Sequence, residues 1–151
     1  MRAEVKVLEP DIIGVTESWA DERMANEEIA IDGYEMFTRD RMLDIKGGGV
    51  LLYIRRLLKV RGIELENNFP EQVWCKLKYN GNQELLIGVC YRTPSEQVYG
   101  YKAHQEITDL IKEVSNREFV LMGEFNYKGI DWATNCEDNG ISTEGTLFWN
   151  V

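Results

Sequence analysis

The sequence predicts a single layered domain of mixed α/β type. Its 151 residues suit one domain, since domains usually run to about 100–200 residues. Hydrophobic residues make up 44% of the chain, charged residues make up 28%, and there are only 3 prolines, which is the composition of a protein that buries a core. Most of the patterned segments are strand-like and one amphipathic helix lies between them, so strands in layers with a crossing helix are expected.

Six short runs have the residue pattern of β-strands. They lie at residues 11–16, 34–39, 50–54, 73–79, 84–91 and 118–122. The first is nearly continuous in apolar residues, which is typical of a strand buried on both faces. Between the fourth and the fifth stands Asn80-Gly81, a dipeptide that strongly favours a two-strand hairpin.

Helical patterns are fewer. Residues 1–9 resemble the end of a helix, with Pro10 at a position where helices often stop. Residues 20–32 are acidic and weakly patterned, which predicts a loop or a short helix. From Tyr101 to Val114 the apolar residues recur at three- and four-residue spacing, so an amphipathic helix with one buried stripe is expected.

The charge of the chain narrows the classes of function. The formal net charge is −9, which disfavours a general nucleic-acid coat, because such binding depends on basic patches that neutralise phosphate. A narrow site in which a cation meets phosphate stays allowed. A membrane span needs about 18 consecutive apolar residues, and no run in this chain is nearly that long. The first six residues do not have the pattern of a signal peptide. We therefore expect a soluble, intracellular protein, with nucleus and cytoplasm both open.

Cysteine and histidine usage argues against two further classes of site. Cys75, Cys90 and Cys136 are an odd number without a CxxC spacing, which disfavours a disulfide framework and a zinc site. Cys75 and Cys90 lie in strand-like runs and are expected in the core. His104, the only histidine, lies in the predicted helix, and a serine or cysteine triad within this chain would have to use it.

Polar residues follow three of the predicted strands directly. Glu17 follows the first strand, residues 91–94 (YRTP) end the fifth, and Glu124 and Asn126 follow the sixth. Loops at strand ends are where α/β folds tend to place sites. The planar fork of an arginine suits phosphate, and a tyrosine offers one donor. Glu124 and Asn126 are two residues apart, so they share a face of an extended chain.

Each of these features has a plainer interpretation. A lone carboxylate such as Glu17 at a strand end is usually solvated, and Pro94 can begin an ordinary turn beside a half-buried Tyr91. The densest basic stretch comprises Arg55, Arg56, Lys59 and Arg61. It could contact a nucleic-acid backbone, but a solvated strand edge is favoured.

Four segments together resemble one family. They are residues 10–19 (PDIIGVTESW), 47–50 (GGGV), 88–94 (GVCYRTP) and 122–127 (MGEFNY), the last followed by 130–132 (IDW). In order and separation they are similar to the endonuclease/exonuclease/phosphatase superfamily, and most of all to the endonuclease domains of non-LTR (LINE-like) retrotransposons, which accompany reverse transcriptases. The resemblance covers nearly the whole chain. It implies a DNase I-like sandwich of two β-sheets flanked by helices, with the active site where strand ends of both sheets converge.

The resemblance also implies a metal-dependent phosphodiester hydrolase that acts on DNA with Mg²⁺ or Mn²⁺. Glu17 would be the metal ligand, and Tyr91 would contact the phosphate or stabilise the transition state. Asn126 would contact the phosphate. Glu124 stands where the family usually has Asp, the group that orients or deprotonates the attacking water. Because Glu is longer by one methylene, its carboxylate is displaced by about 1 Å, which can cost about 10²-fold in rate.

Two further residues complete the implied site, and two motifs of the family are missing. Arg92 and Trp132 would contact the substrate. The family has an Asn on a strand that would precede residue 1, and a Ser-Asp-His motif that would follow residue 151. We therefore expect residues 1–151 to form one domain that is incomplete at both ends, with weak or no activity alone.

Two other functions stay open at this point. One is a non-catalytic remnant that binds a partner, or another copy of itself, through exposed sheet edges. The other is a phosphatase of the same fold that acts on a phosphorylated small molecule or lipid.

Overall fold

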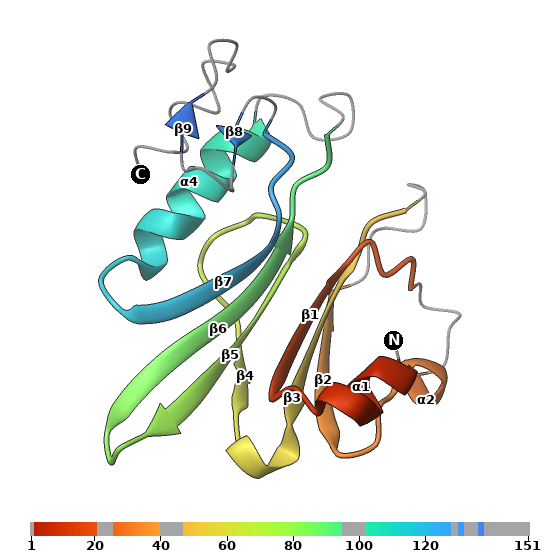
Figure 1. Cartoon of the computed structure of the whole chain (residues 1–151). Coiled ribbons are helices and arrows are strands. Elements are labelled where there is room, and N and C mark those ends of the chain that lie inside the picture. The colour runs from red at the N-terminus through yellow and green to blue at the C-terminus, as the bar shows by residue number, and fades with distance from the viewer. Residues whose placement is uncertain are drawn as a thin grey trace.

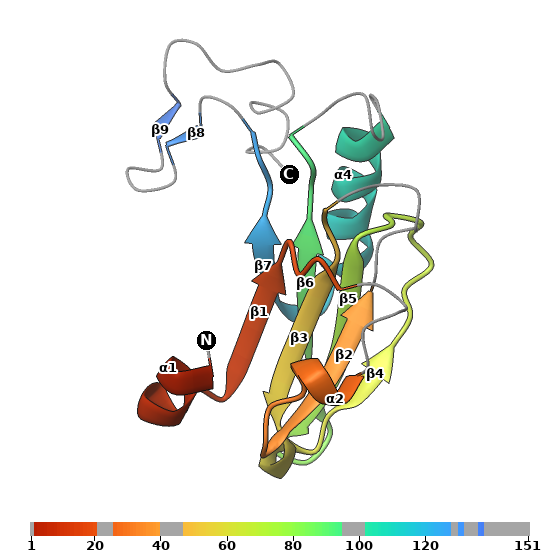
Figure 2. The same ribbon diagram turned by 90° about the vertical axis from the view of Figure 1, so that its right-hand side faces the viewer.

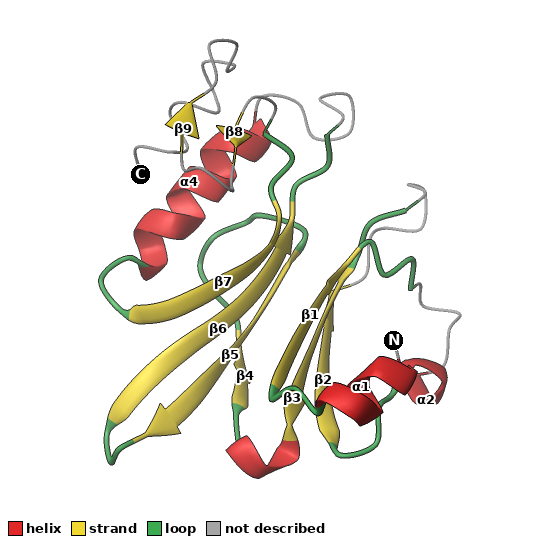
Figure 3. Ribbon diagram, in the orientation of Figure 1, coloured by secondary structure: helices red, strands yellow, loops and turns green. Residues whose placement is uncertain are grey.

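Two β-sheets pack face to face and carry helices on both outer faces (Figures 1 and 3). The computed structural model describes residues 2–20, 26–39, 47–94, 102–127, 130–131 and 136–137. The helices are α1 (Arg2–Leu8), α2 (Asn26–Ile29), the 3₁₀ turn η1 (Arg56–Leu58) and α4 (Lys102–Val114). The strands are β1 (Ile12–Thr16), β2 (Tyr34–Arg39), β3 (Val50–Arg55), β4 (Arg61–Ile63), β5 (Gln72–Tyr79), β6 (Gln83–Tyr91), β7 (Glu118–Glu124), β8 (Ile130–Asp131) and β9 (Cys136–Glu137). The sandwich implied by the resemblance is confirmed.

The first sheet is antiparallel in the order β1-β3-β2. Its central strand β3 carries no charged residue before Arg55, and its residues from Val50 to Ile54 are buried. The outer face of this sheet packs against α1 and α2, where Val5 and Ile31 contact the layer formed by Leu51 and Tyr53. The Tyr53 hydroxyl donates to the Ile29 carbonyl at 2.8 Å, which fixes the end of α2 on the sheet.

The second sheet has the order β4-β5-β6-β7. The predicted hairpin is confirmed, since β5 and β6 pair with Tyr79 opposite Gln83 at the turn. Strands β6 and β7 are parallel, and α4 lies between them in sequence and packs on the outer face of the sheet. The apolar stripe of α4 is buried there, as its spacing predicts. The stripe comprises Ile107, Leu110 and Val114.

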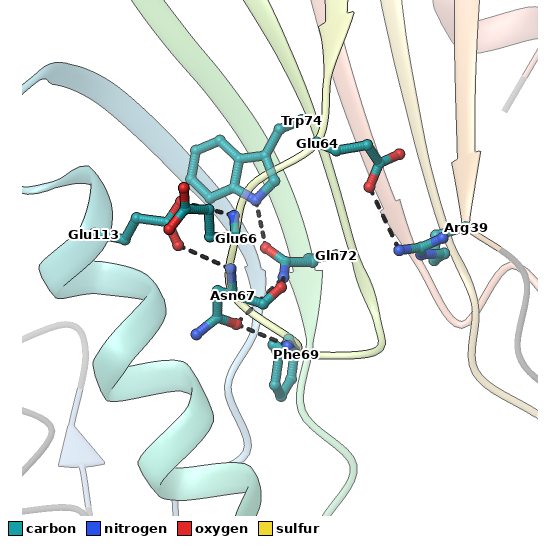
Figure 4. A network of polar contacts seen from close by, with 8 residues as sticks. All are labelled: Arg39, Glu64, Glu66, Asn67, Phe69, Gln72, Trp74 and Glu113. Atoms are coloured by element: carbon teal, nitrogen blue, oxygen red, sulfur yellow. Dashed lines mark hydrogen bonds and ion pairs between the residues drawn. The ribbon is translucent and has the colours of Figure 1, made fainter.

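The connection between β4 and β5 is fastened to α4 by a polar network (Figure 4). The carboxylate of Glu113 accepts the backbone N–H groups of Glu66 and Asn67, each at 3.0 Å. The Asn67 side chain in turn accepts the N–H of Phe69 at 2.7 Å. A charged acceptor that takes two backbone donors is stronger than a neutral one. The network therefore fixes the chain just before Glu71, which enters the candidate site.

Two features differ from the sequence expectations. Strand β1 is only half-buried, because it lies at the edge of its sheet and the described residues place no strand on its other side. Strand β4 was not predicted, because it has only three residues and one of them is a glycine. The solvated edge expected for the basic stretch agrees with exposed Arg61 on this edge strand. None of the described helices is long and apolar enough to cross a bilayer.

Candidate active site

Three strands end at the same end of the sandwich. β1 ends at Thr16, β6 ends at Tyr91 and β7 ends at Glu124, and Figure 2 shows their carboxyl ends side by side. β1 belongs to the first sheet, whereas β6 and β7 are neighbours in the second. The residues that follow these strands are therefore brought together from both sheets, as the sequence predicts.

Glu17 and Tyr91 are joined across the two sheets. The hydroxyl of Tyr91 donates a hydrogen bond to Oε1 of Glu17. Tyr91 is only 3% exposed and packs among the side chains between the sheets, whereas Glu17 is exposed. Glu17 has a positive φ of 50°, a backbone conformation that costs energy in a residue other than glycine and is concentrated at functional sites. The carboxylate is thus presented to solvent by a strained backbone and a buried tyrosine.

Glu124 lies beside Tyr91. The two residues are opposite each other in the parallel register of β6 and β7, so their side chains share one face of the sheet. The residue before Glu124 is Gly123, with φ at 150°, and a Cβ there would lie 1.9 Å from the Cys90 carbonyl oxygen. Only a glycine permits this approach, which brings the exposed carboxyl end of β7 against β6.

The side chains of Asn126 and Arg92 each donate a hydrogen bond to the backbone carbonyl of the other residue. The Asn126 side-chain amide donates to the Arg92 carbonyl at 2.7 Å, and Arg92 Nη1 donates to the Asn126 carbonyl at 3.1 Å. The backbone N–H of Arg92 also donates to the Glu124 carbonyl at 2.8 Å. Asn126 therefore lies where the ends of β6 and β7 meet, and the buried Arg92 faces the loop that carries it.

Glu71 is a component of the site region that the sequence analysis missed. This carboxylate is 1% exposed, and its Oε1 accepts the backbone N–H of Gly49 at 2.8 Å. Its carbonyl accepts the N–H of Tyr91 at 2.9 Å, and the Gly49 carbonyl accepts the N–H of Ser18 at 3.2 Å. Glu71 thereby connects the segment after Glu17 to the end of β6. No sequence pattern marks it, because a glutamate after Pro70 reads as an ordinary loop residue.

An exposed tryptophan stands two residues after Glu17. Trp19 is 64% exposed, and its backbone N–H donates to the Gly48 carbonyl at 3.0 Å. Aromatic surface of this size is usually covered, so its exposure beside a candidate site suits contact with a ligand. Trp132, the tryptophan predicted to contact the substrate, lies outside the described residues.

The donor atoms at this end of the sandwich suit a hard cation. Glu17 and Glu124 present exposed carboxylates, and Mg²⁺ often takes only one or two protein carboxylates together with water. Among the described residues there is no group of three or more His, Cys, Asp and Glu side chains that could hold a metal. Cys75 and Cys90 are buried in the core, and burial raises the pKa of each thiol to about 12. The residues fit Mg²⁺ better than a zinc-like ion.

Comparison with known proteins gives matches among solved structures. No protein-family model matches the chain, and no curated protein matches its sequence. The AP endonuclease LMAP from Leishmania major has a TM-score of 0.73 at 12% identity, over 99% of this chain and 58% of that one. The endonuclease domain of TRAS1, a telomere-specific non-LTR retrotransposon, has a TM-score of 0.65 at 12% identity, over 98% and 59% of the two chains.

A third match carries the superfamily's name. It is an endonuclease/exonuclease/phosphatase family protein from Bacteroides thetaiotaomicron, with a TM-score of 0.55 at 18% identity, over 88% of this chain and 55% of that one. The chain therefore has the DNase I-like fold of the endonuclease/exonuclease/phosphatase superfamily. It spans less than 60% of the length of each of these three structures.

Proposed function

We propose that residues 1–151 are part of one Mg²⁺-dependent phosphodiester hydrolase domain that cuts DNA, of the kind found in non-LTR retrotransposons. The observation that supports this best is the hydrogen bond from Tyr91 to Glu17 across the sheets, with Glu124 beside it in register. Two structural neighbours are an AP endonuclease and a retrotransposon endonuclease domain, which supports DNA as the substrate class.

In this proposal each site residue of the chain has its own role. Glu17 would hold Mg²⁺ or Mn²⁺. The Tyr91 hydroxyl has one proton, which it donates to that carboxylate in this structure and would donate to a phosphate oxygen in the complex with substrate. Asn126 contacts the phosphate, and Glu124 orients the attacking water or accepts its proton. The bound ion supplies positive charge that polarises a phosphoryl oxygen. This charge also lets a chain with a net charge of −9 approach an anionic polymer.

Full activity is proposed for a longer domain. The chain spans 58% and 59% of the two endonuclease structures that it matches. The resemblance implies that further polar groups, an Asn and a Ser-Asp-His motif, lie in segments that it does not span. Groups that stabilise phosphoryl charge are often worth several kcal/mol, about 3–4 for a single donor. We therefore expect residues 1–151 alone to cut DNA weakly or not at all.

A nicking assay on supercoiled DNA tests the proposal. The 151-residue chain and a fusion that adds the first strand and the Ser-Asp-His segment of a related complete domain are assayed with and without Mg²⁺. The fusion should nick DNA, Glu17→Ala should abolish the metal-dependent part, and Glu124→Asp should raise the rate. Glu64→Ala is the matched control, because Glu64 is an exposed carboxylate paired only with Arg39 among the described ion pairs. Equal rates for Glu17→Ala and Glu64→Ala would remove Glu17 from the site.

The exposed sheet edges favour a second candidate function. Among the described strands β1 and β7 are the outer ones of their sheets, and the apolar Val120 on β7 is 43% exposed. Such edges can add a strand from a partner or from a second copy of the chain. If the chain is a non-catalytic interaction module, it should self-associate in sedimentation experiments and the fusion should not nick DNA. A phosphatase of this fold would instead release phosphate from a phosphorylated small molecule or lipid in the same buffer.

A further inference from the structure

Three buried side chains connect helix α4 to the candidate site. They are Arg92, Tyr127 and His104. Arg92 follows β6, Tyr127 follows β7, and His104 lies in the first turns of α4. Each contacts the next, and the series ends at the loop that carries Asn126.

Arg92 is directed at the backbone of that loop. Its Nη1 donates to the carbonyls of Asn126 at 3.1 Å and Phe125 at 3.4 Å. Its own carbonyl accepts the side-chain amide of Asn126 at 2.7 Å. Because the guanidinium is planar and its donors are fixed relative to one another, two carbonyl contacts restrain the loop in orientation as well as in distance.

Tyr127 connects Arg92 to helix α4. The Arg92 Cζ lies 4.3 Å from the centroid of the Tyr127 ring, a cation–π contact that strengthens when both groups are removed from water. The Tyr127 hydroxyl is 3.0 Å from Nδ1 of His104, and the two rings meet edge to face, with centroids 5.8 Å apart. Tyr127 is thus held by a helix that is itself packed on the sheet.

We propose that His104, Tyr127 and Arg92 are positioning residues that set the orientation of the Asn126 side chain and of the end of β7. Asn126 has a positive φ of 51°, so its loop needs restraint from outside to keep this conformation. The effect of this restraint on catalysis rests on the proposed function. The restraint on the Asn126 loop does not depend on that function. Ordinary core packing would make the same three residues matter for stability without fixing Asn126.

Nuclear magnetic resonance of the 151-residue chain separates these two roles. Tyr127→Phe keeps the ring under Arg92 and removes the bond to His104, and Tyr79→Phe is the matched control, because its hydroxyl bonds Glu118 at the far end of the sheet. In Tyr127→Phe the side-chain amide signals of Asn126 should shift, and the amide proton of Arg92 should exchange about fivefold faster, as expected for the loss of one hydrogen bond. Tyr79→Phe should change neither.

A second pair of variants acts from the helix side. His104→Asn can keep a polar atom near the position of Nδ1 and should restore the Asn126 signals, whereas His104→Leu should behave like Tyr127→Phe. Unchanged Asn126 signals and Arg92 exchange in both folded Tyr127→Phe and His104→Leu would overturn the proposal. If Asn126 responds as expected while no form of the domain nicks DNA, the positioning role stands and the proposed function fails.

Discussion

The carboxylate of Glu71 accepts the backbone N–H of Gly49 at 2.8 Å, and this bond joins the two sheets at the end where the candidate site lies. Gly49 directly precedes β3 of the first sheet, whereas Glu71 directly precedes β5 of the second. A carboxylate that is 1% exposed is costly to bury unless it is bonded, so this contact helps to hold the two sheets together here.

Replacement of Glu71 should therefore destabilise the fold strongly. Glu71→Ala leaves the Gly49 N–H without its acceptor and opens space between the sheets, so we expect a loss of about 2–4 kcal/mol of unfolding free energy. Glu71→Gln keeps a carbonyl acceptor and should lose less. Urea unfolding followed by tryptophan fluorescence measures both. Glu64→Ala, at an exposed ion pair, should cost less than about 1 kcal/mol. A loss as small for Glu71→Ala would contradict the assigned role.

Gly123 tests the contact between the ends of β6 and β7. In Gly123→Ala the new Cβ would lie 1.9 Å from the Cys90 carbonyl, and neither backbone can move without breaking the parallel register. We expect a loss of more than about 3 kcal/mol, from strain and overpacking together. Gly81→Ala is the control, because that turn glycine also has a positive φ but meets nothing within 4 Å. Its cost should be about 1 kcal/mol. Similar thermal unfolding of the two variants would refute this account.

The elements with strong local patterns could be predicted from the sequence, and the edges could not. Asn80-Gly81 fixes a hairpin through the φ angles of two residues, and the stripe of α4 follows from spacing alone, so both are local properties. The exposure of β1 is not local. It depends on which strand lies beside β1, and the same apolar run can form either a central strand or an edge strand.

The same distinction applies to the candidate site. Glu17, Tyr91, Glu124 and Asn126 could be named because each follows a strand and matches a familiar segment, and the structure brings all four to one end of the sandwich. Glu71 could not be named, since its importance comes from Gly49, twenty-two positions away in sequence. Its burial is a property of the packed sheets and leaves no mark on its neighbours in the chain.

The buried thiols predict a loss of stability in alkaline solution. Burial raises the pKa of Cys90 from 9.0 to about 12, so the folded protein keeps the thiol protonated where the unfolded chain ionises it. Stability from this group is therefore complete below pH 9 and falls as the pH rises from 9 toward 12. Urea unfolding at pH 8, 9 and 10 should show a steeper decline for the natural chain than for Cys90→Ala. Parallel declines in the two proteins would mean that the thiol ionises as readily when folded.

Trp19 predicts a substitution that weakens DNA binding and spares the fold. Its side chain is 64% exposed two residues after Glu17, so Trp19→Ala should change the unfolding free energy by no more than about 0.5 kcal/mol. If bases stack on this ring, its removal should weaken binding by about 1–3 kcal/mol for one stacked base. Anisotropy of a labelled oligonucleotide, titrated with the 151-residue chain or the longer fusion, measures that loss.

Leu57→Ala is the matched control, because Leu57 is 67% exposed but follows the opposite end of β3. Since both changes remove exposed apolar surface, a nonspecific effect would weaken binding equally in the two variants. Equal affinity of Trp19→Ala and the natural chain would show that the ring does not touch the DNA.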